Sequence, residues 1–202
     1  MMFDELKSKF SPTWIGEVDA LYQEHIVGNL ANDKYFNSPG VYSERFEHDY
    51  EPIIHYFRDI LYPTNISILM YLIKNKMYDV KVLDVGAGAG QLAICLAHLG
   101  IQAVSNDDLS QIGQRKFSHV ENFYEACNAQ FGYSVKYHRR LENVPDDITL
   151  ITIAGFPCLK RKSLTKRFPG VKKILVDVNY IRGFHPQNLQ EAYHNIKVFS
   201  YE

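Results

Sequence analysis

The sequence has few cysteines, no long apolar run and almost no net charge. Its three cysteines, Cys95, Cys127 and Cys158, are odd in number and widely separated, without a spacing typical of metal ligands. They indicate reduced thiols in a cytoplasmic setting rather than a metal site. The longest apolar stretch, residues 66–73, is too short to span a bilayer, and the N-terminus lacks the apolar segment of a signal peptide. We therefore expect a soluble cytoplasmic protein with no membrane partner and no metal.

The charges are balanced, with 22 Lys and Arg against 23 Asp and Glu and a formal net charge of −1. This balance argues against a protein that holds nucleic acid over its whole surface, although it is compatible with a local basic patch. A hydrophobic fraction of 46% is ordinary for a globular protein. The length of 202 residues suits one domain, or one domain with a small cap.

The most informative stretch is residues 80–98, where a β-rich run meets three glycines and a helix-forming run follows at once. Gly86, Gly88 and Gly90 stand at alternate positions, and Asp84 stands two residues before the first of them. Glycine lets the backbone adopt positive φ and lets a ligand approach the main chain, while the next helix points its free N–H groups at the same place. The pattern predicts a strand, a tight turn and a helix, in which the turn is either a ligand-binding loop or a purely structural connection.

The spacing resembles the first motif of the class I S-adenosylmethionine-dependent methyltransferases, which is an acid, any residue and then Gly-x-Gly-x-Gly, here residues 84–90. A dinucleotide-binding fingerprint would place its third glycine one position later, where Gln91 stands. The resemblance implies that Asp84 binds the ammonium group of S-adenosylmethionine. It also implies a backbone cradle for the methionine end of this cofactor, formed by Gly86, Ala87, Gly88 and Gly90.

A second motif lies roughly twenty residues further on, where an acidic pair follows another β-rich run. In a doubly wound fold, the carboxylate that accepts the ribose hydroxyls of a nucleotide stands at this strand end. Either Asp107 or Asp108 suits this role, and the other is then expected to cap or precede the next helix. Together the two motifs predict an α/β fold, a doubly wound and mostly parallel sheet with helices on both faces and an N-terminal helical cap.

We expect residues 1–78 to form the helical cap or lid and residues 79–202 to form the cofactor-binding domain. In the cap, Ser11 and Pro12 are predicted to start a helix that reaches about residue 29. Residues 32–49 form either an aromatic lid or a loop that seals the core, and helices follow near residues 50–61 and 66–76. Strands are expected near residues 80–85, 102–106, 134–139, 148–154, 172–179 and 197–202, with helices near residues 90–99, 109–131, 160–167 and 187–195. The resemblance implies a seventh, antiparallel strand, which we expect to be missing because the chain ends at Glu202.

One stretch departs from the family. Many members carry an acid-led run after the third strand that holds the adenine amino group, and here the corresponding run, residues 140–145, begins with Arg140. Arginine cannot accept a hydrogen bond. The remaining candidates for that part of the cofactor are Leu141, Glu142 and Ala154. The alternative interpretation of the run is a solvated turn.

Candidate catalytic residues follow the fourth and fifth predicted strands, at the carboxyl edge of the sheet where such folds bind their ligands. Pro157 and Cys158 resemble the Pro-Cys pair of cytosine-C5 methyltransferases, whose thiolate attacks the pyrimidine ring. His185 is the leading candidate for a general base, and Tyr180 is a further candidate nearby. A basic run, residues 160–173, flanks the same edge, either as a solvated face or as an attraction for an anionic substrate or a nucleic-acid strand.

Three hypotheses follow from these motifs. The first is an S-adenosylmethionine-dependent methyltransferase that acts on an oxygen or nitrogen atom of a small molecule, which is anionic if the basic run contributes to binding. The second is a nucleic-acid methyltransferase that uses Cys158 or the basic run. The third is a module that binds S-adenosylmethionine without turnover. The oligomeric state does not follow from the sequence.

Overall fold

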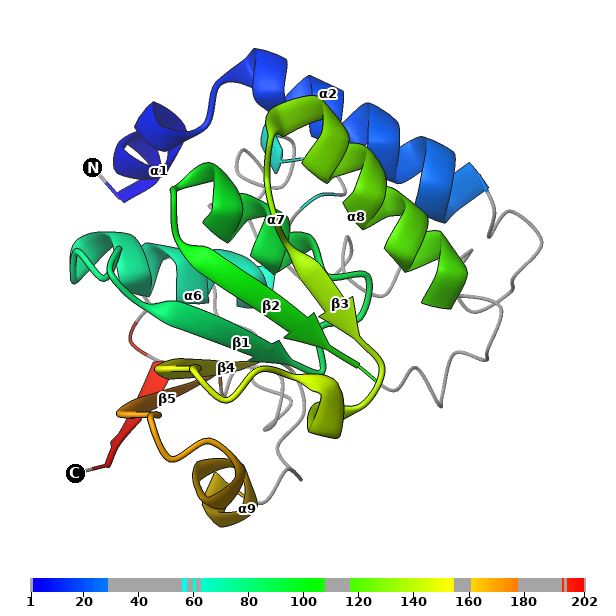
Figure 1. The fold of residues 1–202 in the computed structure, drawn as a ribbon. Helices are drawn as coiled ribbons and strands as arrows, with labels where there is room; N and C mark the ends of the chain where they lie inside the picture. Colours follow the sequence, from blue (N-terminus) through cyan, green and yellow to red (C-terminus); the bar gives the residue numbers. More distant parts are fainter. Residues whose placement is uncertain are drawn as a thin grey trace.

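The computed structural model describes residues 2–28, 56–57, 60, 63–107, 117–154, 161–177, 194 and 196–201. Within these ranges six strands form one sheet in the order β3-β2-β1-β4-β5-β6 (Figure 1). They are β1 (Lys81–Val85), β2 (Gln102–Asn106), β3 (Lys136–His138), β4 (Leu150–Ala154), β5 (Lys173–Asp177) and β6 (Ile196–Ser200). The first five strands are parallel, and β6 runs antiparallel to β5. The predicted mostly parallel, doubly wound α/β fold is confirmed.

The direction of the last strand is not predicted by the sequence. The resemblance implies an antiparallel seventh strand, and in the described part of the chain β6 itself runs antiparallel beside β5. A pattern of apolar residues places a strand in a sheet but does not show its direction, because both faces alternate in the same way in parallel and antiparallel pairs.

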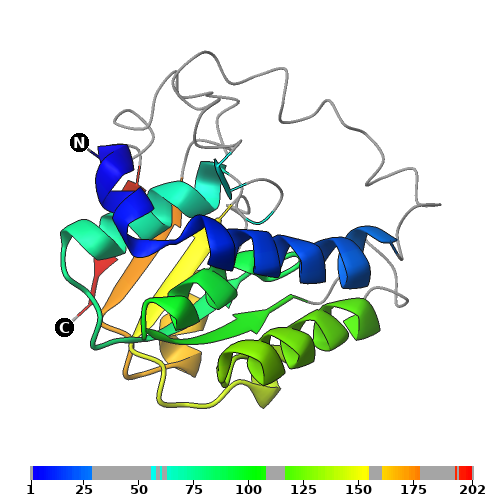
Figure 2. The same cartoon turned by 90° about the horizontal axis from the view of Figure 1, so that it is seen from above.

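Helices cover both faces of the sheet (Figures 1 and 2). One face carries the N-terminal helices α1 (Met2–Lys9) and α2 (Pro12–Tyr22), followed by α6 (Pro63–Lys74), α7 (Gln91–His98) and α8 (Phe117–Phe131). The other face carries α9 (Arg161–Arg167). Two short elements complete the described chain, the π-helix η1 (Gln23–Val27) and the 3-10 helix η3 (Leu141–Asn143).

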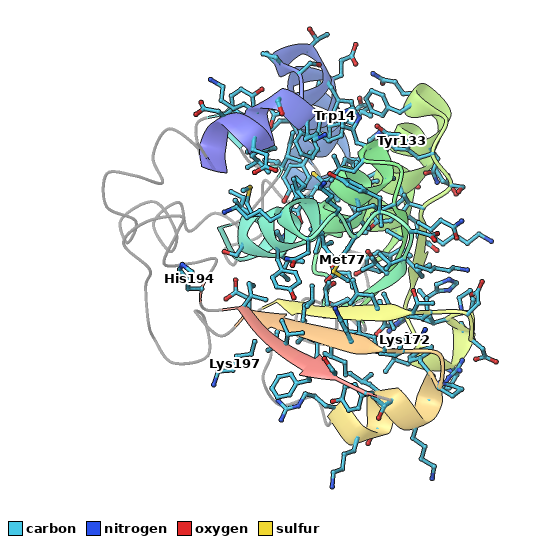
Figure 3. The ribbon with its side chains drawn as sticks, turned by 90° about the vertical axis from the view of Figure 1, so that its left-hand side faces the viewer. Trp14, Met77, Tyr133, Lys172, His194 and Lys197 are labelled. Carbon is cyan, nitrogen blue, oxygen red and sulfur yellow. The ribbon has the colours of Figure 1, made fainter. Side chains whose placement is uncertain are left out.

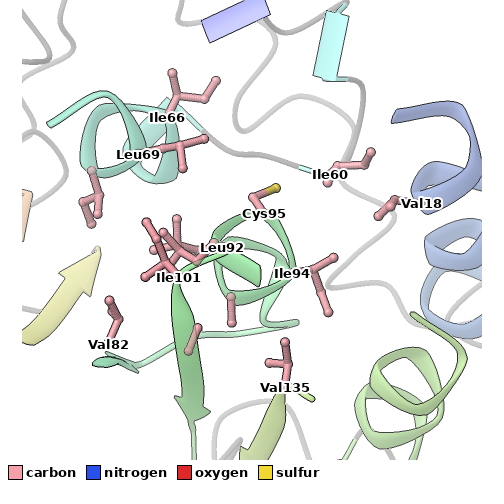
Figure 4. Close-up of a cluster of buried hydrophobic side chains, with 14 of the residues drawn as sticks. Val18, Ile60, Ile66, Leu69, Val82, Leu92, Ile94, Cys95, Ile101 and Val135 are labelled. Atoms are coloured by element: carbon pink, nitrogen blue, oxygen red, sulfur yellow. The ribbon is translucent and has the colours of Figure 1, made fainter. Parts of the chain in front are cut away.

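Each face of the sheet has its own hydrophobic core, because alternate residues of a strand point to opposite sides. The larger core joins the N-terminal helices, α6, α7 and α8 to the residues of the sheet that face them, and Figure 4 shows Leu69 of α6, Leu92 of α7 and Val82 of β1 within it. The smaller core lies between the sheet and α9, where Leu164 and Phe168 are buried. Residues on both sides of the expected boundary at 78/79 therefore share one core, and the division into two domains stays a prediction.

The start of α2 forms as predicted. The Ser11 side chain accepts a hydrogen bond from the backbone N–H of Trp14 at 3.1 Å, and Pro12 occupies the first helical position, where its missing N–H costs nothing. The regular α-helix ends at Tyr22 and the chain continues as the π-helix η1, so the helix predicted to reach about residue 29 is present through the last residue described there, with its final part a π-helix. The predicted lid, residues 32–49, lies outside the described residues, as does most of the helix predicted near residues 50–61.

A cluster of aromatic rings joins the N-terminal helices to the rest of the molecule. The His98 ring stacks on Trp14 at 4.1 Å and on Phe10 at 5.3 Å between centroids. The indole N–H of Trp14 donates to the Tyr133 hydroxyl at 2.8 Å, and Nδ1 of His98 lies 2.9 Å from the same hydroxyl (Figure 3 shows Trp14 beside Tyr133). Nε2 of His98 lies 3.2 Å from the Lys9 carbonyl, which can only accept, so Nε2 carries the proton of the neutral ring and Nδ1 accepts from the Tyr133 hydroxyl. Burial lowers the pKa of His98 and thereby favours this neutral imidazole.

None of the described helices combines the length and the apolar character needed to cross a membrane.

The first prediction concerns the pH dependence of stability. Burial lowers the pKa of His98 below its usual value of about 6.5, so protonation favours the unfolded chain. The stabilisation is complete above the unfolded pKa and is lost as the pH falls below about 6.5. Urea denaturation between pH 5 and pH 8 (about the range over which histidine titrates) should show a free energy of unfolding that falls with acidification. His98→Gln should reduce this slope, and His138, whose pKa burial also lowers, contributes to the remainder.

His119→Gln is the matched control, because His119 is a half-buried residue of α8 outside the aromatic cluster. It should leave the contribution of His98 to the slope in place. An equal slope in the wild-type protein and in His98→Gln would contradict the assignment of a neutral His98.

Candidate functional site

The glycine loop, residues 86–90, connects the carboxyl end of β1 to the first turn of α7. Its three glycines all have positive φ, at 73° for Gly86, 58° for Gly88 and 74° for Gly90. Residues with a Cβ rarely adopt these values, so the alternation of glycines in the sequence corresponds to three successive requirements of the backbone. The predicted strand, turn and helix are present.

Gly88 and Gly90 differ in what surrounds them. A Cβ built on Gly88 would have no heavy atom within 4 Å, whereas a Cβ on Gly90 would lie 2.1 Å from the Tyr124 hydroxyl oxygen. Gly90 is therefore required by the packing of the protein itself. Gly88 leaves open space over its main chain, as a loop that admits a ligand must.

The loop is tied to the carboxyl end of β2 by its backbone amides. The N–H groups of Gly86 and Ala87 donate to the carbonyl of Asn106 at 2.9 and 3.2 Å. The N–H of Gly88 donates to Oδ2 of Asp107 at 2.8 Å. The structure thus places Asp107, one of the two residues predicted to bind the ribose, directly against the middle of the glycine loop.

Two tyrosine hydroxyls hold the carbonyl groups of the loop. Tyr137 of β3 donates to the Gly88 carbonyl at 2.7 Å, and Tyr124 of α8 donates to the Gly90 carbonyl at 2.7 Å. The Tyr124 hydroxyl also lies 2.7 Å from Oγ of Ser105, which must then act as the donor because the tyrosine proton is used. Burial raises the pKa of Tyr124 well above its usual value, so this hydroxyl stays protonated and keeps its bond to the loop.

Three polar residues form a row across the central strands on the face that α7 covers. Asp84 of β1 is paired in register with Ser105 of β2 and Thr152 of β4, and all three are buried. Asp84 is 2% exposed, and its carboxylate accepts a hydrogen bond from the Thr152 hydroxyl at 2.9 Å. A buried carboxylate with one such bond is poorly compensated for its lost hydration.

Burial therefore raises the pKa of Asp84 to about 7, against the opposing effect of the Thr152 hydrogen bond and with a smaller contribution from the negative charge of Asp107. Near neutral pH the group is divided between its acid and its carboxylate. A cation brought to it would favour the carboxylate, so Asp84 is suited to an ammonium group.

The other predicted site residues are less fully placed. Leu141 and Glu142 form part of η3, where Leu141 packs against the smaller core and the Glu142 carbonyl accepts from Arg167 at 3.3 Å. Ala154 ends β4, opposite Asp177 of β5. Their roles in cofactor binding stay predictions. Four candidates lie outside the described residues, namely Asp108, Cys158, Tyr180 and His185.

Sequence reasoning missed the residues that support the loop from elsewhere in the chain. The sequence pattern indicates only that a helix contains Tyr124 and that strands contain Tyr137, Ser105 and Thr152. For Ser105 and Thr152 the available signal was a hydroxyl side chain inside an otherwise apolar strand, since buried polar groups need a partner. For the tyrosines no local signal existed. Within the described ranges, no group of three His, Cys, Asp or Glu side chains could hold a metal ion.

Comparison with known proteins finds similar structures but no matching family model and no matching curated protein. Among solved structures it is similar to ribosomal protein L11 methylase from Lactobacillus delbrueckii subsp. bulgaricus, at 15% identity and a TM-score of 0.44, over 69% of this chain and 79% of that chain. It is also similar to the YcgJ protein from Bacillus subtilis, at 19% identity and a TM-score of 0.37, over 55% of this chain and 48% of that one. Both are likenesses of fold.

Proposed function

We propose that the protein is an S-adenosylmethionine-dependent methyltransferase. The observation that carries the proposal is the open main chain of Gly88, held at positive φ beside Asp107 and close behind the strand that bears Asp84. S-adenosylmethionine, when bound, supplies an electrophilic methyl group on a sulfonium sulfur. The protein has to bind this molecule, orient it and keep its charged groups compensated.

The residues present fit the cofactor in three respects. The glycine loop offers a main chain without side chains in the way, as the methionine end requires. Asp84 supplies a buried carboxylate that gains from a nearby cation, which suits the ammonium group. Asp107, with Asp108 as the alternative, supplies a carboxylate for the ribose hydroxyls at the end of β2. Leu141, Glu142 and Ala154 are proposed for the adenine side.

The acceptor is proposed to be an oxygen or nitrogen atom of a small molecule, because a net charge of −1 does not favour a surface devoted to nucleic acid. Displacement at a sulfonium needs orientation and, for a hydroxyl or a protonated amine, a base that removes a proton. His185 is proposed as this base, with Tyr180 as a further candidate.

A nucleic-acid acceptor is the second candidate. It is favoured by a group of exposed cations on α9 and its neighbours, which the next subsection describes. In that case Cys158 is the candidate nucleophile, and a covalent step would require its thiolate.

The second prediction tests cofactor binding. Gly88→Val puts a branched side chain into the open space at a strained positive φ, which costs roughly 1–2 kcal/mol of backbone energy. Titration calorimetry should show that S-adenosylmethionine no longer binds, while circular dichroism shows the native fold.

Gly132→Val is the matched control, because Gly132 also has positive φ, at 71°, and open space around its Cβ, but lies at the end of α8 away from the loop. It should lose similar stability and keep full affinity. Gly90→Ala should instead destabilise the fold, because its Cβ meets Tyr124. Unchanged affinity in Gly88→Val would reject the glycine loop as the binding site.

The third prediction follows from the raised pKa of Asp84. The carboxylate is the form that binds a cation, so binding should release a proton and affinity should fall about tenfold per pH unit below about 7. Calorimetry in two buffers of different ionisation enthalpy measures the released proton. Asp84→Asn should weaken binding and remove its pH dependence between about pH 5.5 and 7.

Thr152→Val gives a directional control. The Thr152 hydrogen bond lowers the pKa of Asp84, so its loss should move the midpoint of the affinity profile to higher pH. A profile that is flat in the wild-type protein, or one that persists in Asp84→Asn, would show that another group contacts the ammonium.

The fourth prediction concerns the tyrosine that holds Gly88. Tyr137→Phe keeps the ring and removes the hydrogen bond to the Gly88 carbonyl, which is worth about 1 kcal/mol. The dissociation constant for S-adenosylmethionine should rise about fivefold, and the melting temperature should fall slightly because a hydrogen bond of the folded protein is lost. Tyr133→Phe, the same chemical change in the aromatic cluster, should lower the melting temperature and leave the dissociation constant unchanged. Equal effects of the two variants on binding would contradict a positioning role for Tyr137.

A further inference from the structure

One part of the chain is strongly basic. Between Asp147 and Asp177 the sequence contains no acidic residue and seven cationic ones, although the whole protein is nearly neutral. The cations are Lys160, Arg161, Lys162, Lys166, Arg167, Lys172 and Lys173. The structure describes all of them except Lys160. This stretch therefore carries positive charge that no acidic residue within it balances.

Cations with a structural role in this region have visible partners. Arg167 pairs with Asp146 and also donates to the Val144 carbonyl at 2.8 Å, which ties α9 to the chain after η3. Lys81 pairs with both carboxylate oxygens of Asp147 at 2.6 Å. These contacts use the two acidic residues that stand immediately before the basic stretch.

Five other cations have no such role. Arg161, Lys162, Lys166, Lys172 and Lys197 are exposed, and no carboxylate of the described chain pairs with any of them. We refer to these five residues as the basic face. On α9, Lys162 and Lys166 are four positions apart, where like charges repel by roughly 0.2–0.5 kcal/mol, while the helix dipole favours Lys166 in the last turn by a similar amount. These exposed charges therefore add little to folding and are available for binding.

Strand register places Lys197 beside α9. Lys197 is paired with Val176 and Phe199 with Ile174, and both partners belong to the smaller core that α9 covers. Lys197 and Phe199 therefore lie on the α9 side of the sheet. Lys172 precedes β5 at the other end of the same strand pair, so the basic face extends along the strands (Figure 3 shows Lys172 and Lys197 toward opposite ends).

An aromatic platform lies within the basic face. The guanidinium carbon of Arg161 is 3.8 Å from the centroid of the half-buried Phe199 ring, a distance typical of a stacked cation–π pair. The ring holds the exposed guanidinium plane in place without using its charge. A held guanidinium plane is a surface on which nucleic-acid bases stack.

We propose that the basic face binds a single strand of nucleic acid, with its phosphates on the lysines and one base stacked on Arg161. Phosphates alone would account for the lysines, but the stacked Arg161 distinguishes a ligand with bases from an acidic protein or an anionic membrane. A single strand is favoured over a duplex because its bases are free to stack. The proposal concerns a second ligand, which binds without S-adenosylmethionine and is tested apart from the proposed function.

The test is fluorescence anisotropy of the full-length protein with a labelled single-stranded RNA of about 20 nucleotides, and with the same sequence as DNA, at increasing salt. Five phosphate contacts predict a slope of about −3.5 in a plot of log affinity against log salt. Lys166→Glu with Lys197→Glu should reduce the slope by about 1.4 and weaken binding roughly tenfold or more at low salt. The double reversal Lys74→Glu with Lys76→Glu changes two exposed lysines at the end of α6 and in the turn after it, and should have a much smaller effect.

Two further variants serve as controls. One separates an effect on binding from an effect on folding, and the other separates recognition of bases from attraction to phosphate charge alone. Lys162→Glu alone places an acid in the first turn of α9 and pairs it with Lys166 four positions later, the favoured order, so it should raise or preserve the melting temperature while it weakens binding. Arg161→Lys keeps the charge and loses the plane, so it should weaken RNA binding about fivefold and leave the binding of inorganic polyphosphate unchanged.

Several results would overturn the proposal. One is the absence of RNA binding at low salt. Another is an affinity for a duplex, for polyglutamate or for phosphatidylserine vesicles equal to that for the single strand. A third is an equal loss of RNA affinity in the Lys166/Lys197 and Lys74/Lys76 double variants. Gly88→Val should bind RNA as the wild-type protein does. If the wild-type protein binds RNA but not S-adenosylmethionine, this proposal stands and the proposed function fails. If it binds S-adenosylmethionine but not RNA, this proposal is rejected and the proposed function holds.

Discussion

The site depends on a backbone constraint, the positive φ of three alternate residues between β1 and α7. Only glycine adopts these values readily, and a loop built in this way has no side chains of its own at those positions to hold it in place. Its position is determined from outside, by Asn106 and Asp107 through the amides and by two tyrosine hydroxyls through the carbonyls. The loop is therefore open to a ligand on one side and hydrogen-bonded to the fold elsewhere.

The same arrangement explains the polar residues inside the sheet. Ser105 supports Tyr124, which holds the Gly90 carbonyl, and Thr152 supports Asp84, which is raised in pKa by burial. A folded protein gains no stability from a carboxyl group buried with one hydrogen bond. A bound cation would compensate the lost hydration of the Asp84 carboxylate. Burial of Asp84 thus accounts both for its energetic cost in the free protein and for its proposed role in binding.

The two sides of the sheet also differ in their charges and in their uses. On the side of the larger core, α7 and α8 support the glycine loop, and the aromatic cluster around His98 fixes the N-terminal helices. On the side of the smaller core, α9 and β6 carry the exposed cations of the basic face. The proposed binding of a cationic cofactor and the proposed binding of a polyanion would thus use residues on different sides of the sheet, where the charges of one site do not oppose those of the other.

The sequence by itself determined the order of the elements and the position of the glycine loop, because both follow from local rules. Alternating and helical apolar patterns predicted all six described strands, and Gly86, Gly88 and Gly90 indicated the conformation of their own backbone. The direction of β6, the tyrosines that hold the loop, the pKa of Asp84 and the stacking of Arg161 on Phe199 were decided only by the tertiary structure. Each of these depends on residues far apart in the chain, and their distances and burial arise only when the strands are paired and the helices packed.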